Sequence, residues 1–346
     1  MKAAFLVGPQ QFEIRQIPDP EVPHDGLVMD IKACGVCGSD LRRWREGLPA
    51  GREPYISGHE FAGVVTAVGP DQHDYKVGDL LAVAADVHCG KCYYCQRGMF
   101  NLCESAQLVG ISAGMPGGLG EKAALSGHIL TNGIVHRMPD GMSFEHAALA
   151  EPLSSVLAAH HKAQTNISHT VVVLGGGPIG CLHIAVAHAR GAKVILSEPS
   201  AERREMAAPF QPDAVIDPFK EDVIVRVREL TGGLGADIVV CANPIAATQT
   251  QAIEMVRKGG RVVLFGGLPK ANKMVSFDSN RIHYDEIEVV GAFSYHPIFH
   301  EQALDVLQRG LIDGNIVITH IFSLDEVDQA FQASANGQAL KAIVKP

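Results

Sequence analysis

The stretch from Thr170 to Gly180 constrains the fold of this chain more than any other. Four apolar residues, Val171–Leu174, run into three consecutive glycines, and a helical pattern follows from Ile179 to Arg190. A short apolar run bounded by glycines is typical of a strand buried in a parallel sheet. The stretch therefore predicts a buried parallel strand that turns sharply into a helix.

The glycine turn has the spacing of a dinucleotide-binding turn. Gly175 permits the tight bend, Gly177 lets the backbone approach a pyrophosphate, and Gly180 lets the helix pack closely on the strand. Pro178 and Ile179 open the helix, whose first N–H groups have no intrahelical partner and can bind phosphate oxygens. We expect a dinucleotide cofactor at this turn.

The acid that follows the turn favours NAD as that cofactor. Glu198 closes the next apolar run, 18 residues after Gly180, where a carboxylate would receive the ribose hydroxyls and repel a 2′-phosphate. Arg203 and Arg204 follow and could hold such a phosphate, so NADP stays the alternative. Gly266, at the end of a later predicted strand, should lie beside the nicotinamide and its ribose.

The rhythm of the sequence divides the chain. Up to about residue 150, short apolar runs separated by Pro, Gly and Asp predict mostly β structure, including a hairpin of Phe61–Gly69 and Tyr75–Val83. Strands and helices then alternate, which predicts a doubly wound α/β domain. Its expected strands are Val171–Leu174, Ala192–Leu196, Ala214–Ile216, Asp237–Cys241, Arg261–Phe265 and Ile287–Val290. A helix at Glu301–Arg309, a capping box of Ser323 and Glu326, and a last strand at Lys341–Lys345 complete the chain.

Composition excludes several classes of partner. A formal net charge of -9 argues against nucleic acid or an anionic membrane surface as the main partner. The N-terminal apolar run is too short for a signal peptide, and no segment reaches membrane-spanning length. Several of the eight cysteines are crowded together, which fits metal binding in a reducing compartment better than disulfides. We expect a cytoplasmic protein.

Four cysteines on one short segment predict a structural metal site. Cys89, Cys92, Cys95 and Cys103 have two, two and seven residues between them. Four thiolates so close in sequence can surround one tetrahedral zinc. Because such a site leaves no open coordination position, its role is to organise a lobe of the protein.

A second set of metal-binding residue types is dispersed along the chain. It comprises Cys37, His59 with Glu60, and Glu151, whereas Cys34 fits a packed core position. Sulfur, nitrogen and oxygen ligands from distant segments suit a catalytic zinc that keeps one position for water or substrate.

Together these motifs resemble a known family. The sequence Cys-Gly-Ser-Asp at 37–40, Gly-His-Glu at 58–60, the four-cysteine loop, Glu-Pro-Leu at 151–153 and the glycine turn are similar to the zinc-containing medium-chain alcohol dehydrogenases. The Glu that follows His59 and the Glu-Pro-Leu sequence resemble the polyol branch, which includes sorbitol dehydrogenase and its threonine and sugar-phosphate relatives.

The resemblance implies an architecture and an activity. Residues 1–152 would form a GroES-like β-barrel catalytic domain, 153–291 a Rossmann NAD-binding domain, and 292–346 a return to the catalytic domain, with the active cleft between the domains. The enzyme would oxidise a secondary alcohol of a polyol or sugar derivative with NAD, reversibly, and use one catalytic and one structural zinc per chain. It would be a homo-oligomer, a tetramer or a dimer.

The resemblance also assigns roles to residues. Cys37 and His59 would bind the catalytic zinc, and either Glu60 or Glu151 would be the third protein ligand. Asp40 would accept the N–H of His59 and fix its tautomer. Ser39 would accept or relay the proton of the substrate hydroxyl.

One departure from the family opens an alternative substrate. Relatives often carry a histidine three residues after that serine, whereas this chain has Arg42, which cannot accept a proton near neutral pH. The proton would then leave through ribose hydroxyls, a glutamate or water. Alternatively, Arg42 or Arg43 could bind an anionic group of the substrate, which would be a sugar acid, a sugar phosphate or an amino alcohol such as threonine.

Three aromatic residues and one further class of function complete the expectations. Trp44 could wall the substrate cleft or pack in the core, and Tyr295 and His296 could reach the cleft.

A catalytically dead binding or structural homologue is the alternative from another class of function, and the intact candidate ligands argue against it.

Overall fold

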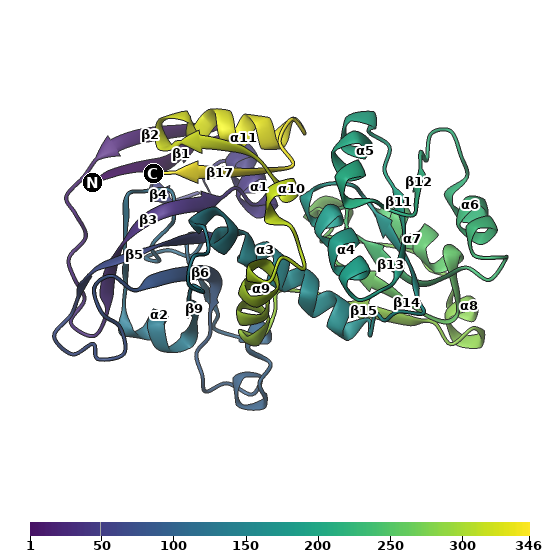
Figure 1. Ribbon diagram of the computed structural model, residues 1–346, viewed down its shortest axis with the longest axis horizontal. Coiled ribbons are helices and arrows are strands. Elements are labelled where there is room, and N and C mark those ends of the chain that lie inside the picture. Colours follow the sequence, from purple (N-terminus) through teal and green to yellow (C-terminus); the bar gives the residue numbers. More distant parts are fainter. Residues whose placement is uncertain (49) are drawn as a thin grey trace. The chain divides into compact units, whose positions relative to one another are not determined.

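The computed structural model describes residues 1–48 and 50–346. The chain divides into two units, the first made of Met1–Ser154 and Ser294–Pro346 and the second of Ser155–Phe293 (Figure 1). The domain boundaries expected after residues 152 and 291 each lie two residues before the corresponding boundary between the units. Among the described residues, no helix combines the length and the apolar character that crossing a bilayer requires.

The first unit is built on β-sheets. Its strands are β1 (Lys2–Gly8), β2 (Gln11–Gln16), β3 (Leu27–Gly35), β4 (Tyr55–Ile56), β5 (Phe61–Val68), β6 (Leu80–Val87), β7 (Gln107–Leu108), β8 (Lys122–Leu125), β9 (Gly133–Arg137), β16 (Ile318–Ser323) and β17 (Lys341–Lys345). Its helices are α1 (Gly38–Glu46), α2 (Gly127–Asn132), α9 (Ile298–Gln308), α10 (Gly314–Val317) and α11 (Val327–Ala335), and α3 (Phe144–Lys162) runs across the unit boundary.

The main sheet of this unit joins both ends of the chain. Its strand order is β16-β17-β3-β5-β6-β7, with β8 added beside β3 and β9 beside β6. The C-terminal strand β17 pairs antiparallel with β3, as the yellow and purple strands in Figure 1 show. The expected last strand is therefore confirmed, as is the capping box, in which Ser323 and Glu326 cap each other's backbone before α11. The return of the chain adds a strand next to the segment that carries Cys37.

One strand differs from its expected position. The second strand of the hairpin begins at Leu80 and ends at Val87, not at Tyr75 and Val83. The segment before it forms a tight turn in which the N–H groups of Gly78 and Asp79 bond to Val65 and Lys76. The strand continues further than expected because its last residues are also buried in the core.

The second unit is a six-stranded parallel sheet with helices. Its strands are β10 (Thr170–Leu174), β11 (Lys193–Ser197), β12 (Ala214–Ile216), β13 (Ala236–Cys241), β14 (Val256–Leu264) and β15 (Glu288–Gly291), and its helices are α4 (Pro178–Ala189), α5 (Ala201–Ala207), α6 (Val223–Leu230), α7 (Ala246–Met255) and α8 (Ser279–Tyr284). The strand order is β12-β11-β10-β13-β14-β15, and every pair is parallel. The order reverses between β10 and β13, so a ligand site is expected at the carboxyl ends of those strands. The doubly wound fold expected from the sequence is confirmed.

Candidate active site and metal centres

Cys37, His59 and Glu60 meet where strand β3 ends and strand β5 begins in the main sheet of the first unit. Strands β3 and β5 pair antiparallel with Cys34 opposite Phe61, so the residues just after β3 and just before β5 lie side by side. One ligand atom of each of the three candidate ligands lies within 4.8 Å of the others. The strand register thus brings together side chains from two separate motifs.

The donor set of this cluster fits zinc. It offers one sulfur, one imidazole nitrogen and one carboxylate oxygen, which leaves a fourth tetrahedral position open. His59 and Glu60 are buried, and within the described residues Glu60 Oε1 has no hydrogen-bond partner. A buried carboxylate oxygen without a partner is costly unless a cation binds it. These residues therefore fit a metal ion that the cluster would hold.

Asp40 lies beside the imidazole of this cluster. It lies in the first turn of α1 and is buried, with Oδ2 at 3.3 Å from Nδ1 of His59. The two atoms are not aligned for a hydrogen bond, so the contact is one of charge. Burial opposes the charged imidazole, but Asp40 and Cys37 together raise the pKa of His59 well above its ordinary value. Since Nδ1 faces Asp40, Nε2 is the nitrogen free to bind a metal.

Glu60 forms an ion pair that the sequence did not indicate. Lys341, at the start of β17, is buried and donates from Nζ to Glu60 Oε2 and, at 3.0 Å, to the carbonyl oxygen of Val36. No motif includes this lysine, and the two residues are 281 positions apart in the chain. Only the pairing of β17 with β3 brings them together.

Glu151 lies outside the cluster of three. It is in α3, and its Oε1 accepts a hydrogen bond of 3.1 Å from the hydroxyl of the buried Tyr295. Burial raises the pKa of Glu151 to about 7, with His59 opposing this shift and Glu60 adding to it. Close by, Ser294 donates to Asp86, a contact that no sequence pattern indicated. The structure thus brings Glu60, rather than Glu151, within ligand distance of Cys37 and His59.

Ser39 lies next to the cluster on α1. Its hydroxyl donates to Cys37 Sγ at 3.3 Å, and the side chain is exposed. It is therefore close to a candidate ligand and open to solvent on its other side.

The four-cysteine segment forms a second cluster. Its four sulfur atoms all lie within 4.8 Å of one another, with Cys92 and Cys95 3.4 Å apart and Cys89 and Cys95 4.0 Å apart. Tetrahedral ligands about 2.3 Å from zinc are about 3.8 Å apart, which these distances bracket. The backbone N–H groups of Cys95 and Glu104 lower the pKa of Cys92 to about 6, whereas burial raises that of Cys95 to about 12. A cation bound to the four sulfur atoms would offset the repulsion among four thiolates.

All eight cysteines of the chain are free thiols. The alternative reading of the Cys89–Cys103 segment as a disulfide scaffold is not supported. The donors present fit a structural zinc.

The glycine turn in the second unit leads from β10 into α4. Gly175 has a φ of 111°, which few other residues adopt, and a Cβ on Gly180 would lie 1.8 Å from the carbonyl oxygen of Gly175. Gly177 is the N-cap of α4, with Pro178 and Ile179 following, and no side chain caps the helix. The first N–H groups of α4 are thus available to an anion, as a pyrophosphate would require.

Glu198 closes one side of this turn. It is buried, and its carboxylate accepts hydrogen bonds from the N–H groups of Gly176 at 2.6 Å and Ser200 at 2.9 Å. Each oxygen keeps capacity for one more donor, such as a ribose hydroxyl. Arg204 pairs with Asp217 at 3.0 Å.

Two further candidate cofactor residues lie near the same strand ends. Arg203 is exposed. Gly266 follows β14, and a Cβ there would lie 2.4 Å from the carbonyl oxygen of Asn243. Gly266 therefore packs against the loop after β13, at the carboxyl edge of the sheet.

Comparisons with known proteins agree with both units. Residues 23–139 match the family model for the alcohol dehydrogenase GroES-like domain, and residues 178–309 match that for the zinc-binding dehydrogenase. Sorbitol dehydrogenase of Bacillus subtilis is 30% identical, over 100% of this chain and 97% of that protein. The chain belongs to the zinc-containing medium-chain alcohol dehydrogenases. It is an oxidoreductase of the polyol branch of that family.

Other relatives and solved structures have the same extent. D-arabitol-phosphate dehydrogenase of Enterococcus avium is 30% identical, over 98% of this chain and 95% of that protein. L-threonine 3-dehydrogenase of Pyrococcus furiosus is 33% identical, over 95% and 94%. Among solved structures, alcohol dehydrogenase TADH from Thermus sp. ATN1 superimposes with a TM-score of 0.92 at 28% identity, covering 100% of this chain and 99% of that one. The family resemblance inferred from the motifs is confirmed.

Arg42 and Trp44, both considered for substrate binding, differ from each other in exposure. Arg42 is exposed on α1. Trp44 is 2% exposed in the core of the first unit, where its ring lies 5.9 Å from that of Phe331. Of the two roles considered for Trp44, packing in the core fits these surroundings, because the buried indole lies against Phe331 of α11.

The remaining candidates are accounted for by their neighbours in the first unit. Arg43 is half-buried and lies by Tyr55. The ring of His296 lies 5.0 Å from Phe100, in the segment that carries the four cysteines. Neither contact indicates a role in substrate binding.

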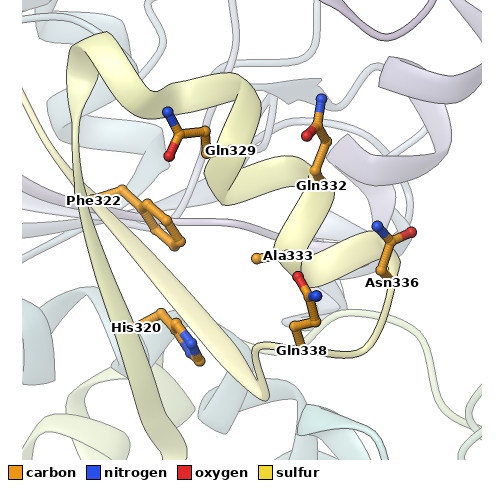
Figure 2. A pocket seen from close by; sticks show the side chains of 7 residues that line it. All are labelled: His320, Phe322, Gln329, Gln332, Ala333, Asn336 and Gln338. Atoms are coloured by element: carbon orange, nitrogen blue, oxygen red, sulfur yellow. The ribbon is translucent and has the colours of Figure 1, made fainter.

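A surface hollow lies between β16 and α11 (Figure 2). Amide side chains surround it, and the stacked rings of His320 and Phe322 line its other side with centroids 6.0 Å apart. Its lining residues are His320, Phe322, Gln329, Gln332, Ala333, Asn336 and Gln338. None of them is a residue that the motifs indicated, so this hollow is not the candidate active site.

Proposed function

We propose that this protein is a zinc-dependent dehydrogenase that oxidises a secondary alcohol of a polyol or sugar derivative to a ketone, with NAD as the hydride acceptor, and that catalyses the reverse reduction. The observation that carries this proposal is the cluster of Cys37, His59 and Glu60, a three-donor set with an open fourth position. Its occurrence in a chain related to sorbitol dehydrogenase supports the substrate class.

Each residue of the cluster has a task in this reaction. Zinc, when bound, would supply Lewis acidity that lowers the pKa of the substrate hydroxyl, as it lowers that of water from 15.7 to about 7 in favourable sites. Cys37, His59 and Glu60 would hold the metal, and Asp40 would keep Nε2 of His59 turned toward it. The exposed hydroxyl of Ser39, next to Cys37, would take the substrate proton and pass it to solvent.

Glu151 would act beside the cluster rather than within it. The hydrogen bond from Tyr295 holds one of its oxygens, and the other remains a candidate acceptor for a water or a substrate hydroxyl. This arrangement supports Glu60 as the third protein ligand.

NAD would bind in the second unit. The uncapped N-terminus of α4 would bind the pyrophosphate, and Glu198 would accept the ribose hydroxyls. Arg204 is already paired with Asp217, so one of the two arginines that could hold a 2′-phosphate is committed elsewhere. This favours NAD over NADP, with Arg203 as the residue through which NADP could still bind.

A second substrate class rests on Arg42. Its exposed guanidinium could bind a carboxylate or phosphate, and D-arabitol-phosphate dehydrogenase and L-threonine 3-dehydrogenase are among the relatives. The same hydride transfer would then act on a sugar acid, a sugar phosphate or threonine. The neutral polyol is our first choice because two sorbitol dehydrogenases are among the relatives.

The formation of NADH, followed by absorbance, tests the substrate class. Purified enzyme is offered neutral polyols, aldonic acids, sugar phosphates and threonine. We expect the highest kcat/KM with a neutral polyol, and an equal value for the Arg42→Ala variant. Preference for an anionic substrate, lost in Arg42→Ala, would reject the polyol in favour of the second class. The absence of NADH formation with any alcohol would support the catalytically dead homologue.

We further propose the remaining organisation. The first unit would be the GroES-like catalytic domain and the second the Rossmann NAD-binding domain, with one catalytic and one structural zinc per chain. The protein would act in the cytoplasm as a homotetramer or homodimer.

A further inference from the structure

Lys341 is placed unlike the other lysines. Of the lysines in residues 1–48 and 50–346, it alone is buried, with 4% of its surface exposed. Burying an ammonium group is costly unless a negative charge and hydrogen-bond acceptors compensate it. Lys341 has both, because its Nζ donates to Glu60 Oε2 and to the carbonyl oxygen of Val36.

The two oxygens of the Glu60 carboxylate have different surroundings. Oε2 is bound by Lys341, whereas Oε1 is buried without a hydrogen-bond partner inside the described part of the chain. Glu60 also belongs to the cluster with Cys37 and His59. One oxygen of this carboxylate is therefore committed, and the other is left for a cation.

We propose that Lys341 is a positioning residue that acts on the catalytic metal through Glu60. It holds one carboxylate oxygen and presents the other, so that Glu60 is a one-oxygen ligand of moderate strength. This inference rests on the proposed function, because it assigns Glu60 to the metal. Lys341 itself does not touch substrate or cofactor in this account.

The charges of the site support this role. Asp40 and Glu60 carry two negative charges, and Cys37 carries a third when it is a thiolate ligand. A zinc ion would contribute two positive charges, and Lys341 contributes the one that remains. Within this set the charges balance, which lowers the cost of burying them; Glu151, beside the set, adds negative charge only when it is ionised.

The backbone around Glu60 is built to admit Lys341. Strand β17 pairs with β3 so that Ile343, which is two residues after Lys341, lies opposite Gly35. A Cβ on Gly35 would lie 2.0 Å from Oε2 of Glu60 and 3.1 Å from Cε of Lys341. Glycine at this position therefore leaves the space in which the carboxylate and the ammonium meet.

The main chain of Glu60 is fixed, so only its carboxylate can respond. The N–H of Gly35 donates to the carbonyl oxygen of Glu60 at 2.7 Å. Removing the ammonium would release Oε2 and leave the full carboxylate charge for the metal. Zinc should then be held more tightly, because a competing cation next to its ligand is gone.

The test measures zinc release to a coloured chelator in excess. The fraction of zinc that belongs to the cluster is identified by its absence in Cys37→Ser. We expect Lys341→Met to slow the release of this fraction by about 10-fold, a change as large as the smallest known for partners of metal ligands but opposite in direction, because Lys341 competes with the metal for Glu60. Lys341→Gln removes the charge but keeps donors for Glu60 and Val36. It should slow the release less than Lys341→Met does, and it replaces that variant in the test if Lys341→Met does not fold.

Two comparisons show whether Lys341 acts through Glu60. In a Glu60→Gln background, the change at Lys341 should have little further effect, as double-mutant cycles show for coupled residues. Lys122→Met is the matched control, since Lys122 pairs with Asp30 at 2.9 Å in the same unit but does not belong to the cluster. It should leave release unchanged.

A second readout follows the metal directly. With cobalt(II) in place of zinc, the visible absorption bands that Cys37→Ser abolishes should shift in Lys341→Met and Lys341→Gln and stay unchanged in Lys122→Met.

The outcomes separate the two proposals. Unchanged release and unchanged cobalt bands in both Lys341 variants would overturn the inference, as would equal effects in the presence and absence of Glu60. If the wild type has no fraction of zinc that depends on Cys37, the proposed metal site itself fails, and the inference fails with it.

Discussion

The contact between Asp40 and His59 supplies a quantitative prediction. Two unit charges 3.3 Å apart would interact by about 5 kcal/mol at an effective dielectric constant of 20. A metal-bound imidazole carries only part of a charge, and the amide oxygen that replaces the carboxylate keeps a partial negative charge, so Asp40→Asn should lose only a fraction of this. We expect zinc affinity at the cluster to fall about 10- to 100-fold, which is about 1.4 to 2.7 kcal/mol.

Competition with a chelator of known affinity measures this loss. The zinc that depends on Cys37 is titrated in the wild type, in Asp40→Asn and in the control Asp30→Asn. Asp30 is an acid on β3 that pairs with Lys122 and does not belong to the cluster. A wild-type zinc affinity in Asp40→Asn, or an equal loss in Asp30→Asn, would refute the argument that the buried carboxylate orients the ligand.

Three other perturbations have expected outcomes. Cys92→Ser should lower the melting temperature and the zinc content by one ion per chain, because the four-thiolate site organises its segment; wild-type zinc content would count against that site. Phe331→Ala should cost about 3–5 kcal/mol, since this ring is fully buried against Trp44, whose fluorescence in urea follows the first unit; a loss near zero would show that the core relaxes around it. Burial lowers the pKa of His160 to about 3 and that of His183 well below its usual value, so both stay neutral in the fold while the unfolded chain takes up protons below pH 6.5. Stability should therefore fall as the pH drops from 6.5 toward 3, by about 1.4 kcal/mol per pH unit for each histidine; circular dichroism in urea should give a smaller slope for His160→Gln, and an equal slope would contradict this.

The local parts of the fold were predictable from sequence because neighbouring residues determine them. The strand and turn from Thr170 to Gly180 depend on an apolar run and on glycines a few positions apart, and they form as expected. The same holds for the last strand, Lys341–Lys345, whose bounds match. The hairpin strand placed at Tyr75–Val83 was misplaced, because apolar residues in a turn look like the start of a strand.

The site was predictable in its ligands but not in their arrangement. Cys37, His59 and Glu60 stand in recognisable motifs, yet the choice between Glu60 and Glu151 depends on how β3 pairs with β5. Lys341 has no motif at all, since its role arises from a strand pairing across most of the chain.

Trp44 illustrates a choice that the sequence left open. Its position beside the candidate ligands made a role in the cleft plausible, but consecutive residues of a helix point in different directions. Asp40 points toward His59, whereas Trp44 points into the core. Proximity in sequence to a functional motif therefore does not predict proximity to its site.

Alcohol oxidation by NAD in this protein should depend on the zinc that Cys37, His59 and Glu60 would hold. The most direct measurement is the rate of NADH formation with a polyol for the wild type and Cys37→Ser, each before and after removal and return of zinc. We expect the wild type to lose activity when the metal is removed and to regain it when zinc is returned, and folded Cys37→Ser to be inactive throughout. Activity of Cys37→Ser equal to that of the wild type would contradict it.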